Sequence, residues 1–345
     1  MRKDIRFLLF LFIGSISCQL ISMKPAEAKD SESSAAFYYE VIHPENQLND
    51  VGYFDLRMKP EQKQTVKINL INTGDQPLTI EVSLNSAKSS SNGVIDYGPN
   101  QLPKDQSLDL DFTELVKTAD LVDIPARSSK ELLLEITMPK EQFDGTIAGG
   151  IQLQVKEEKS KQTQEQAINN RFAYLIGMLL TETDVAVEPD LIFRNVYAGQ
   201  NNFRNTIFVE FSNIAKTFME EMQVDVQIQK VGENSILFSE VRDGMRMAPN
   251  SLLRFPISLS GERMRPGEYN AKIKISDQQN EWHWNETFSI SKEKAQKYNK
   301  EDVDIAEKSV IDWKLLIILL LSVIIFLGVL GIILYSKHQK KDAKN

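Results

Sequence analysis

The feature that most constrains the fold of this chain is an alternation of apolar and polar residues with a period of two, which recurs over most of its length. Successive side chains of a β-strand point to opposite faces of the sheet, so this period predicts strands that bury one face and expose the other. The alternating segments fall within residues 66–70, 80–84, 132–138 and 151–155 of the first half, and within 207–211, 224–228, 253–257, 269–275 and 282–290 of the second. The pattern predicts an all-β fold.

The length of the chain sets the number of domains. Its 345 residues exceed a single domain of about 150 residues, and turn-forming sequences such as Asn72–Asp75 separate the strands. We expect two immunoglobulin-like β-sandwiches in tandem, formed by residues 29–187 and 188–290. The charged stretch 156–170 is either a linker or a hairpin that protrudes from the first sandwich. The apolar strand that follows it, 172–180, favours the hairpin.

The N-terminal residues have the order of charge and hydrophobicity typical of a secretory signal peptide. A basic start is followed by an apolar run, and Ala26-Glu27-Ala28 offers the small residues of a cleavage site. We expect a signal peptide over residues 1–28. Two alternatives are a retained anchor over Phe7–Met23 and a lipid-modified Cys18, although Ser15-Ile16-Ser17 lacks the leucine that usually precedes such a cysteine.

The C-terminal residues predict a membrane anchor. From Leu315 to Leu334 the chain carries no charge, and these twenty residues would rise roughly 30 Å as a helix, the hydrocarbon thickness of a bilayer. We expect a charged stalk at 291–312, a transmembrane helix at 313–335 and a basic cytoplasmic tail at 336–345. The predicted localisation is the cell membrane, single-pass, with the N-terminal ectodomain outside facing the cell wall and the C-terminus cytoplasmic.

Charge and composition exclude several classes of function. The net charge is −8 although both ends are basic, so the part between them is strongly acidic and unsuited to nucleic acid. The one cysteine, Cys18, precedes the predicted cleavage site, which leaves no thiol for a disulfide or a zinc site. The chain has three histidines. His338 lies in the predicted cytoplasmic tail, and we interpret His43 and His283 as ordinary surface residues. No metal or other cofactor is expected.

Enzyme activity is not predicted. A triad needs a histidine beside a nucleophile, and the sequence contains neither a G-x-S-x-G elbow nor H-E-x-x-H nor a glycine-rich phosphate loop. Two facing carboxylates are the one remaining catalytic arrangement, and they would make the protein a glycan hydrolase.

Recognition is the remaining class, and one aromatic region has groups that suit saccharides. The candidate glycan-binding residues are Asn46, Asn49, Tyr53, Asn92, Asp96 and Tyr97. They supply the planar amides, the carboxylate and the ring faces that hold sugars, although each alone is also explained by a turn or a pleat.

The second half contains candidates for binding a partner protein. The segment Met222–Gln229 alternates with a polar outer row and has no proline, so we expect it to be an edge strand that accepts a partner strand, through Val224, Val226 and Gln227. The alternative is an internal strand. Trp282 and Trp284 are a further candidate surface for partner binding, although tryptophans in such a strand more often pack into the core.

Several segments resemble the WxL-interacting proteins of low-GC Gram-positive bacteria. In the first half these are YEVIHPENQ, VGYFDLRMKPEQKQTV, NTGDQP, SNGVIDY, MPKEQFDGTIAGGI and RFAYLIGMLL, and in the second MAPNSLLRFPISL, MRPGEY and NEWHWNETFSI. The resemblance implies a membrane-anchored surface scaffold whose first domain binds peptidoglycan and whose second binds a secreted WxL-domain protein or a host surface ligand. It brings no catalytic motif. A host-matrix adhesin and a cell-wall glycan hydrolase are the alternatives.

Overall fold

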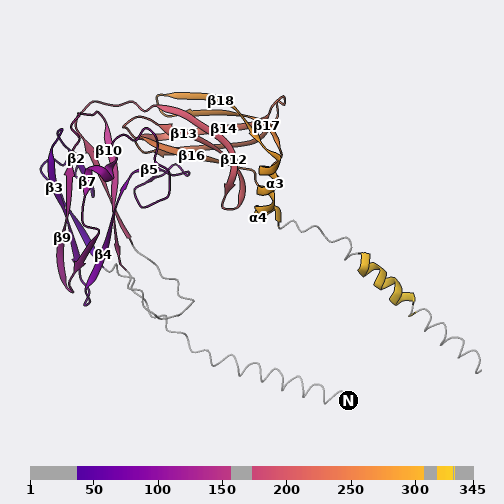
Figure 1. Cartoon of the computed structure of the whole chain (residues 1–345), viewed down its shortest axis with the longest axis horizontal. Helices are drawn as coiled ribbons and strands as arrows, with labels where there is room; N and C mark the ends of the chain where they lie inside the picture. The colour runs from indigo at the N-terminus through magenta and orange to yellow at the C-terminus, as the bar shows by residue number, and fades with distance from the viewer. Residues whose placement is uncertain (1–36, 157–172, 307–316, 329, 331–345) are drawn as a thin grey trace, which may run out of the picture. The chain divides into compact units, whose positions relative to one another are not determined.

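The protein is almost entirely β-structure in the part that the computed structural model describes, which is residues 37–156, 173–306, 317–328 and 330. Two sets of paired sheets follow one another along the chain (Figure 1). The predicted all-β fold is therefore confirmed. The immunoglobulin-like assignment and the domain boundary at 187/188 stay predictions.

The first sandwich consists of two sheets packed face to face. One sheet has the strand order β1 (Tyr38–Ile42), β3 (Lys63–Asn72), β9 (Ser128–Thr137), β7 (Val116–Lys117). The other has the order β2 (Phe54–Arg57), β11 (Ala173–Thr181), β10 (Thr146–Val155), β4 (Leu78–Ser86), β8 (Leu121–Ile124). All of these pairs are antiparallel except β2 with β11, which is parallel. A short ribbon, β5 (Lys88–Ser89) with β6 (Ile95–Asp96), and the helix α2 (Phe112–Leu115) complete it.

The period-two residues form the core of this sandwich. Ile68 on β3 lies opposite Leu132 on β9, and both are buried. Ile151 of the facing sheet is buried in the same cluster. Such cross-strand apolar pairs are the main stabilising unit of a sheet. The strand predicted at 172–180 is β11, which pairs with β10 from Ala173 to Thr181, while the residues between them, 157–172, lie outside the described part.

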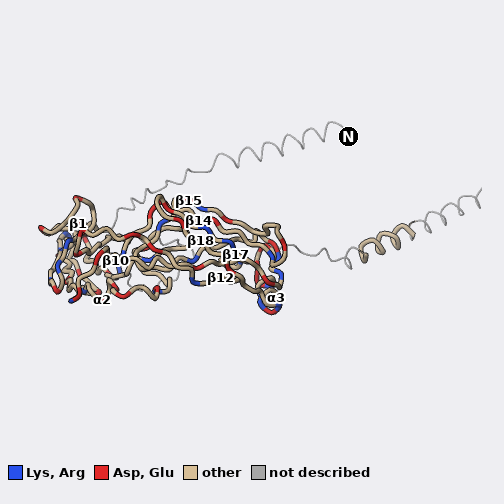
Figure 2. The backbone as a smooth tube through the Cα atoms, turned by 90° about the horizontal axis from the view of Figure 1, so that it is seen from above, with Lys and Arg blue, Asp and Glu red and all other residues tan. Residues whose placement is uncertain are grey.

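The second sandwich repeats the two-layer plan with seven strands. One sheet has the order β12 (Leu191–Asn201), β13 (Arg204–Asn213), β16 (Ser251–Ser258), and the other β15 (Ile236–Met247), β14 (Met219–Lys230), β17 (Gly267–Ser276), β18 (Glu281–Ile290). Their facing apolar residues form one buried cluster that includes Phe211, Val226 and Phe255. Acidic and basic residues are interspersed along the backbone of both sandwiches (Figure 2).

Helices α3 (Lys292–Glu301) and α4 (Val303–Ala306) pack on the second sandwich. The side chain of Asn299 accepts from the Met264 amide at 2.7 Å and donates to the Met264 carbonyl at 2.8 Å. The buried Asp302 accepts from the Asn205 amide at 2.7 Å. The first part of the predicted stalk, 291–312, is therefore docked rather than free, and residues 307–312 lie outside the described part.

One prediction about the ends of the chain is wrong. No helix among the described residues is long and apolar enough to cross a membrane. This finding contradicts the predicted localisation as a single-pass membrane protein. The predicted signal peptide, the cytoplasmic tail and the flanks of the predicted 313–335 helix lie outside the described residues.

The two sandwiches contact each other through buried polar groups. Ser89 Oγ lies 2.6 Å from Ser251 Oγ and accepts from the Ala248 amide at 2.9 Å. The carboxylate of Asp105, which is buried, accepts hydrogen bonds from Ser212 and, at 3.2 Å, from Arg194. Burial disfavours the charged form of Asp105, but the hydrogen bonds outweigh it and hold the pKa of this carboxyl below its ordinary value.

Candidate functional site

A cleft of about 460 Å³ lies where the two sandwiches meet, and it contains two of the residues singled out from the sequence. We call it the tyrosine cleft. Its lining residues are Tyr53, Tyr97, Leu175, Gly177, Leu179, Phe218, Glu220 and Arg246. The first five of these residues, from Tyr53 to Leu179 in the list, belong to the first sandwich, and the last three belong to the second.

The floor of the tyrosine cleft is the outer face of β11. Because side chains alternate along a strand, Leu175, Gly177 and Leu179 point away from the core that takes Ile176 and Met178. Gly177 leaves the floor without a side chain beneath Tyr53, whose Cβ lies 3.7 Å from where a Cβ at Gly177 would be. The floor is therefore shallow and apolar.

A second glycine brings Tyr97 onto the sheet. Gly150 on β10 pairs directly with Gly177 on β11. A Cβ at Gly150 would lie only 2.3 Å from the backbone oxygen of Tyr97, which is far inside contact distance. Only glycine allows the Tyr97 backbone to approach β10 so closely, and this approach fixes the place of its ring in the cleft.

A charged pair from the second sandwich forms the wall. Arg246 on β15 binds the Glu220 carboxylate on β14 through two nitrogens, with Nη2 2.6 Å from Oε1. The Arg246 amide donates to the Gly93 carbonyl at 2.8 Å, which ties the wall to the turn before Tyr97. Both side chains are about half exposed, so the pair presents polar groups to a ligand while it holds its own geometry.

Tyr97 is a neutral phenol in this setting. Burial raises its pKa above the ordinary value, with Tyr53 and Glu220 acting in the same direction and Arg246 against them. Within the described residues neither Tyr53 nor Tyr97 uses its hydroxyl in a hydrogen bond, whereas Tyr174, Tyr197 and Tyr269 do. Two tyrosine side chains whose hydroxyls have no hydrogen bond among the described residues therefore line the cleft.

The other four candidate glycan residues do not line the cleft. Asn46 donates to the Arg57 carbonyl at 2.7 Å, and Asn49 to Asp55 at 2.6 Å. Asp96 accepts from the Gly98 amide at 2.9 Å. Asn92 is exposed in the turn between β5 and β6. Three of these side chains thus have structural partners, and a role for any of the four in glycan binding stays a prediction.

Sequence reasoning missed the wall of the cleft. Glu220 and Arg246 lie more than 120 positions along the chain from Tyr97, and nothing in their local sequence marks them as partners of a tyrosine. The alternation along β11 indicated that Leu175 and Leu179 share a face, but it gave no sign that this face lies against another sandwich.

The structure corrects the predicted edge strand. Strand β14 contains Val224, Val226 and Gln227, and it pairs with β15 on one side and β17 on the other. The prediction that it is an edge strand is wrong, because a polar outer row occurs on any strand with one solvent face. Val224 and Val226 are completely buried, and Gln227 is half-buried on the outer face.

The two tryptophans lie on β18, the outer strand beside β17. Trp282 and Trp284 are half-buried and pack against the core of the second sandwich. The structure thus supports the core interpretation of these residues. Their backbone still belongs to an outer strand, so a contribution to partner binding stays a prediction.

Two family models match the chain. The WxL Interacting Protein, peptidoglycan binding domain, matches residues 37–155, and the WxL Interacting Protein, host binding domain, matches residues 163–300. The second match begins before β11, which pairs with β10 of the first sandwich. No curated protein matches the chain.

Solved structures similar to this chain include two that contain chaperones. The CupB2 chaperone of Pseudomonas aeruginosa is 10% identical, with 66% of this chain and 92% of that chain covered and a TM-score of 0.26. The CsuC–CsuE chaperone–adhesin complex of Acinetobacter baumannii is 11% identical, with 57% and 84% covered and a TM-score of 0.27. At these TM-scores the similarities have no weight for function.

Proposed function

Because the chain belongs to the WxL-interacting protein family, we propose that it is a non-enzymatic cell-surface scaffold that joins peptidoglycan to a surface protein. The matched domains are binding domains, one for peptidoglycan and one for a host or surface ligand. In this proposal the tyrosine cleft holds the glycan. The second sandwich holds a WxL-domain protein.

The observation that carries the proposal is the pairing of Tyr53 and Tyr97 with the bidentate Arg246–Glu220 pair in one cleft of about 460 Å³. The apolar face of a pyranose ring packs on an aromatic ring, and its hydroxyl and acetamido groups need both donors and acceptors. The stem peptide of peptidoglycan adds carboxylates, which suit Arg246. The cleft provides each of these partners within one small volume.

The glycan site of this proposal includes groups from both sandwiches. Tyr53 and Tyr97 lie within the residues matched by the peptidoglycan-binding domain, while Glu220 and Arg246 lie within those matched by the host-binding domain. Glycan binding then depends on the contact between the sandwiches and not on the first sandwich alone.

Co-sedimentation of the full chain with purified peptidoglycan tests the proposal. We expect Tyr53→Ala and Tyr97→Ala each to weaken binding about tenfold, or about 1.4 kcal/mol. Tyr38→Ala is the matched control, because Tyr38 is an exposed tyrosine of β1 that does not line the cleft. Equal binding by all three variants, each with an unchanged melting temperature, would exclude the tyrosine cleft as the glycan site.

Two separate measurements test the alternative functions, glycan hydrolase and host-matrix adhesin. A glycan hydrolase would release reducing ends from purified wall, and we expect none. A host-matrix adhesin would bind immobilised matrix proteins but not a purified WxL-domain protein. Binding to the matrix alone would replace the scaffold role with the adhesin role.

A further inference from the structure

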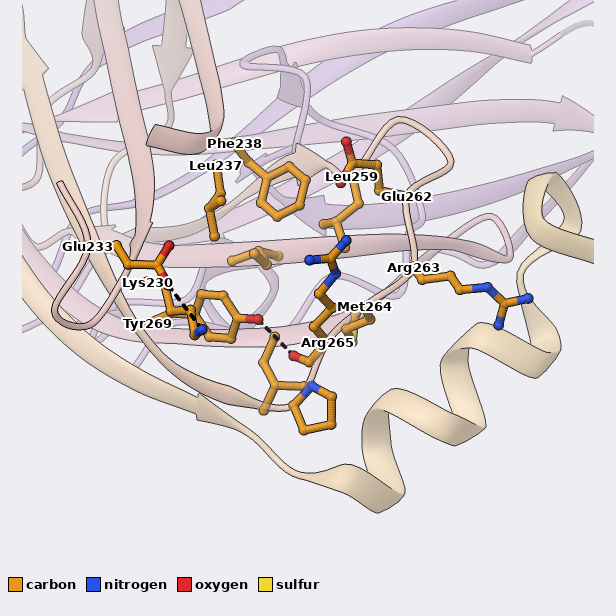
Figure 3. Close-up of a pocket in the computed structure, with 13 residues that line it drawn as sticks. Lys230, Glu233, Leu237, Phe238, Leu259, Glu262, Arg263, Met264, Arg265 and Tyr269 are labelled. Carbon is orange, nitrogen blue, oxygen red and sulfur yellow. Dashed lines mark hydrogen bonds and ion pairs between the residues drawn. The ribbon is translucent and has the colours of Figure 1, made fainter. Parts of the chain in front are cut away.

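A second cavity, of about 330 Å³, lies at one end of the second sandwich (Figure 3). We call it the end cavity. Its inner surface consists of core residues, among them Ile207, Leu259 and Tyr269, all buried. Its volume is at the lower end of the roughly 300–1,000 Å³ typical of ligand pockets, so it suits one large side chain rather than an extended ligand.

The mouth of the end cavity has charges of both signs, because Glu262 lines it together with Lys230, Glu233 and Arg265. Lys230 is paired with Glu233 at 3.0 Å. Arg265 has no ion pair among the described residues, and its side chain extends from the β16–β17 connection toward Phe238 (Figure 3). Arg263 points away from the cavity in the same view. Arg265 is therefore available to an acidic group beside whatever apolar group enters.

The strand that borders the mouth has a free edge. Strand β15 is the outer member of its sheet, and within the described residues it pairs only with β14. At its start Ile236 and Leu237 are exposed, and so is Val241 farther along. The outer backbone groups of such a strand are available to an added strand.

Farther along β15 the inner side is closed to an apolar side chain. Glu240 and Arg242 lie opposite Val226 and Val224 on β14 and therefore face the interior. They form an ion pair at 3.0 Å, and the Arg242 guanidinium lies 5.0 Å from the centre of the Phe255 ring. Inward-pointing charges of this kind oppose apolar insertion at an edge, which leaves the end cavity beside Leu237 and Phe238 as the place for an anchor.

We propose that an extended segment of the protein partner adds to β15 over Ile236–Val241, inserts one aromatic or large aliphatic side chain into the end cavity, and places a carboxylate against Arg265. This inference rests on the proposed function, because it names how the second sandwich holds its surface partner. The free edge favours a peptide over a small amphiphile, since a small molecule would use the cavity and the cation but not the strand.

A panel of short synthetic peptides tests the inference directly. The parent probe is fluorescein-labelled Thr-Val-Thr-Trp-Thr-Asp-Thr, in which the tryptophan and the aspartate share one face of the added strand, and its binding to the full chain is measured by fluorescence anisotropy. We expect replacement of the tryptophan by alanine, or of the aspartate by lysine, to weaken binding at least tenfold. Backbone N-methylation at alternate positions should abolish binding, while the positions between them tolerate it, because only one edge of an added strand pairs. A panel that fails to bind at millimolar concentration, or a probe that tolerates methylation everywhere, would overturn the proposal.

Variants of the protein provide the second arm. Arg265→Glu should weaken the aspartate probe at least tenfold and strengthen the lysine probe. Arg263→Glu makes the same change of charge two residues away, and it should change the affinity for either probe by less than threefold. Both residues are exposed, and melting temperatures verify the fold. If the two variants change probe binding equally, the change comes from the net charge of the surface, and the proposed contact between Arg265 and the carboxylate is wrong.

The same variants separate this inference from the proposed function. If Arg265→Glu still captures a purified WxL-domain protein as the parent does, the scaffold role stands and the end cavity is not its site. If sedimentation velocity shows a dimer of the chain that Arg265→Glu dissociates, the occupant is a second copy of this chain and the proposal of a different partner fails.

Discussion

Gly177 in the floor of the tyrosine cleft and Gly150 beside the Tyr97 backbone permit a test of packing in which one substitution is the control for the other. Gly150 and Gly177 are cross-strand neighbours. A Cβ at Gly150 would meet the Tyr97 backbone oxygen at 2.3 Å, whereas a Cβ at Gly177 would have its nearest neighbour, the Tyr53 Cβ, at 3.7 Å. We expect Gly150→Ala to lower both stability and peptidoglycan binding, and Gly177→Ala not to lower stability.

The magnitude follows from two opposing effects. Neither glycine has a positive φ, so alanine fits the backbone and stabilises by about 0.4–1 kcal/mol through the unfolded chain. At Gly177 this is the main effect. At Gly150 the obstructing atom is backbone and must shift, which adds an overpacking cost of about 1–3 kcal/mol. The net loss expected for Gly150→Ala is about 1–2 kcal/mol, or about 2–8 °C in Tm.

Thermal melts of the full chain and co-sedimentation with purified peptidoglycan at 25 °C measure the two effects separately. A loss of this size leaves nearly all molecules folded, so weaker binding reports a displaced Tyr97. Equal melting temperatures for the two variants would refute the packing argument. A destabilised Gly150→Ala protein that binds normally would show that Tyr97 does not hold the glycan.

Three further predictions concern the sandwiches themselves. Asp105→Asn should lower the free energy of unfolding by about 1–3 kcal/mol at pH 7, because it weakens buried charged hydrogen bonds. The folded pKa of Asp105 is lowered from 3.8, so its stabilising contribution is present above that value and is lost as the pH falls below it. In urea unfolding, the stability difference between the parent and the variant should therefore narrow toward pH 3, and a constant difference would contradict the assignment. Asn299→Ala should release α3 from the Met264 backbone and make residues 292–306 cleavable by limited proteolysis, and unchanged cleavage would mean that other contacts hold the helix. Gln227→Pro should unfold the second sandwich, because β14 has ladder partners on both sides and proline cannot donate to either. Circular dichroism of an intact sheet would contradict the strand order.

The strands were predictable because alternation is a local property. Val66, Ile68 and Leu70 alternate in the sequence and are buried in the structure. The order of strands in a sheet is not local. Met222–Gln229 has the same alternation whether β15 lies beside it or not, which is why the edge assignment failed.

The tyrosine cleft was predictable only in part. Tyr53 and Tyr97 stood out because each lies in a turn-rich, aromatic stretch of sequence. Glu220 and Arg246 could not be found in this way, because their place beside Tyr97 depends on the contact between two sandwiches. Asn46 and Asp96 show a different limit, since turn-forming residues look like ligand-binding ones until their hydrogen-bond partners are known, and a role for them in glycan binding stays a prediction.

Strand β15 reaches both sites, with Leu237 and Phe238 at the end cavity and Arg246 at the tyrosine cleft. About 26 Å of extended chain separates Phe238 from Arg246, and Gly244, with a φ of 66°, lies at a change of register between them. Thermodynamic linkage requires that if a ligand at one site changes affinity at the other, the effect is reciprocal and equal. A wall-bound molecule and a free one would then differ in how long they retain the same surface protein.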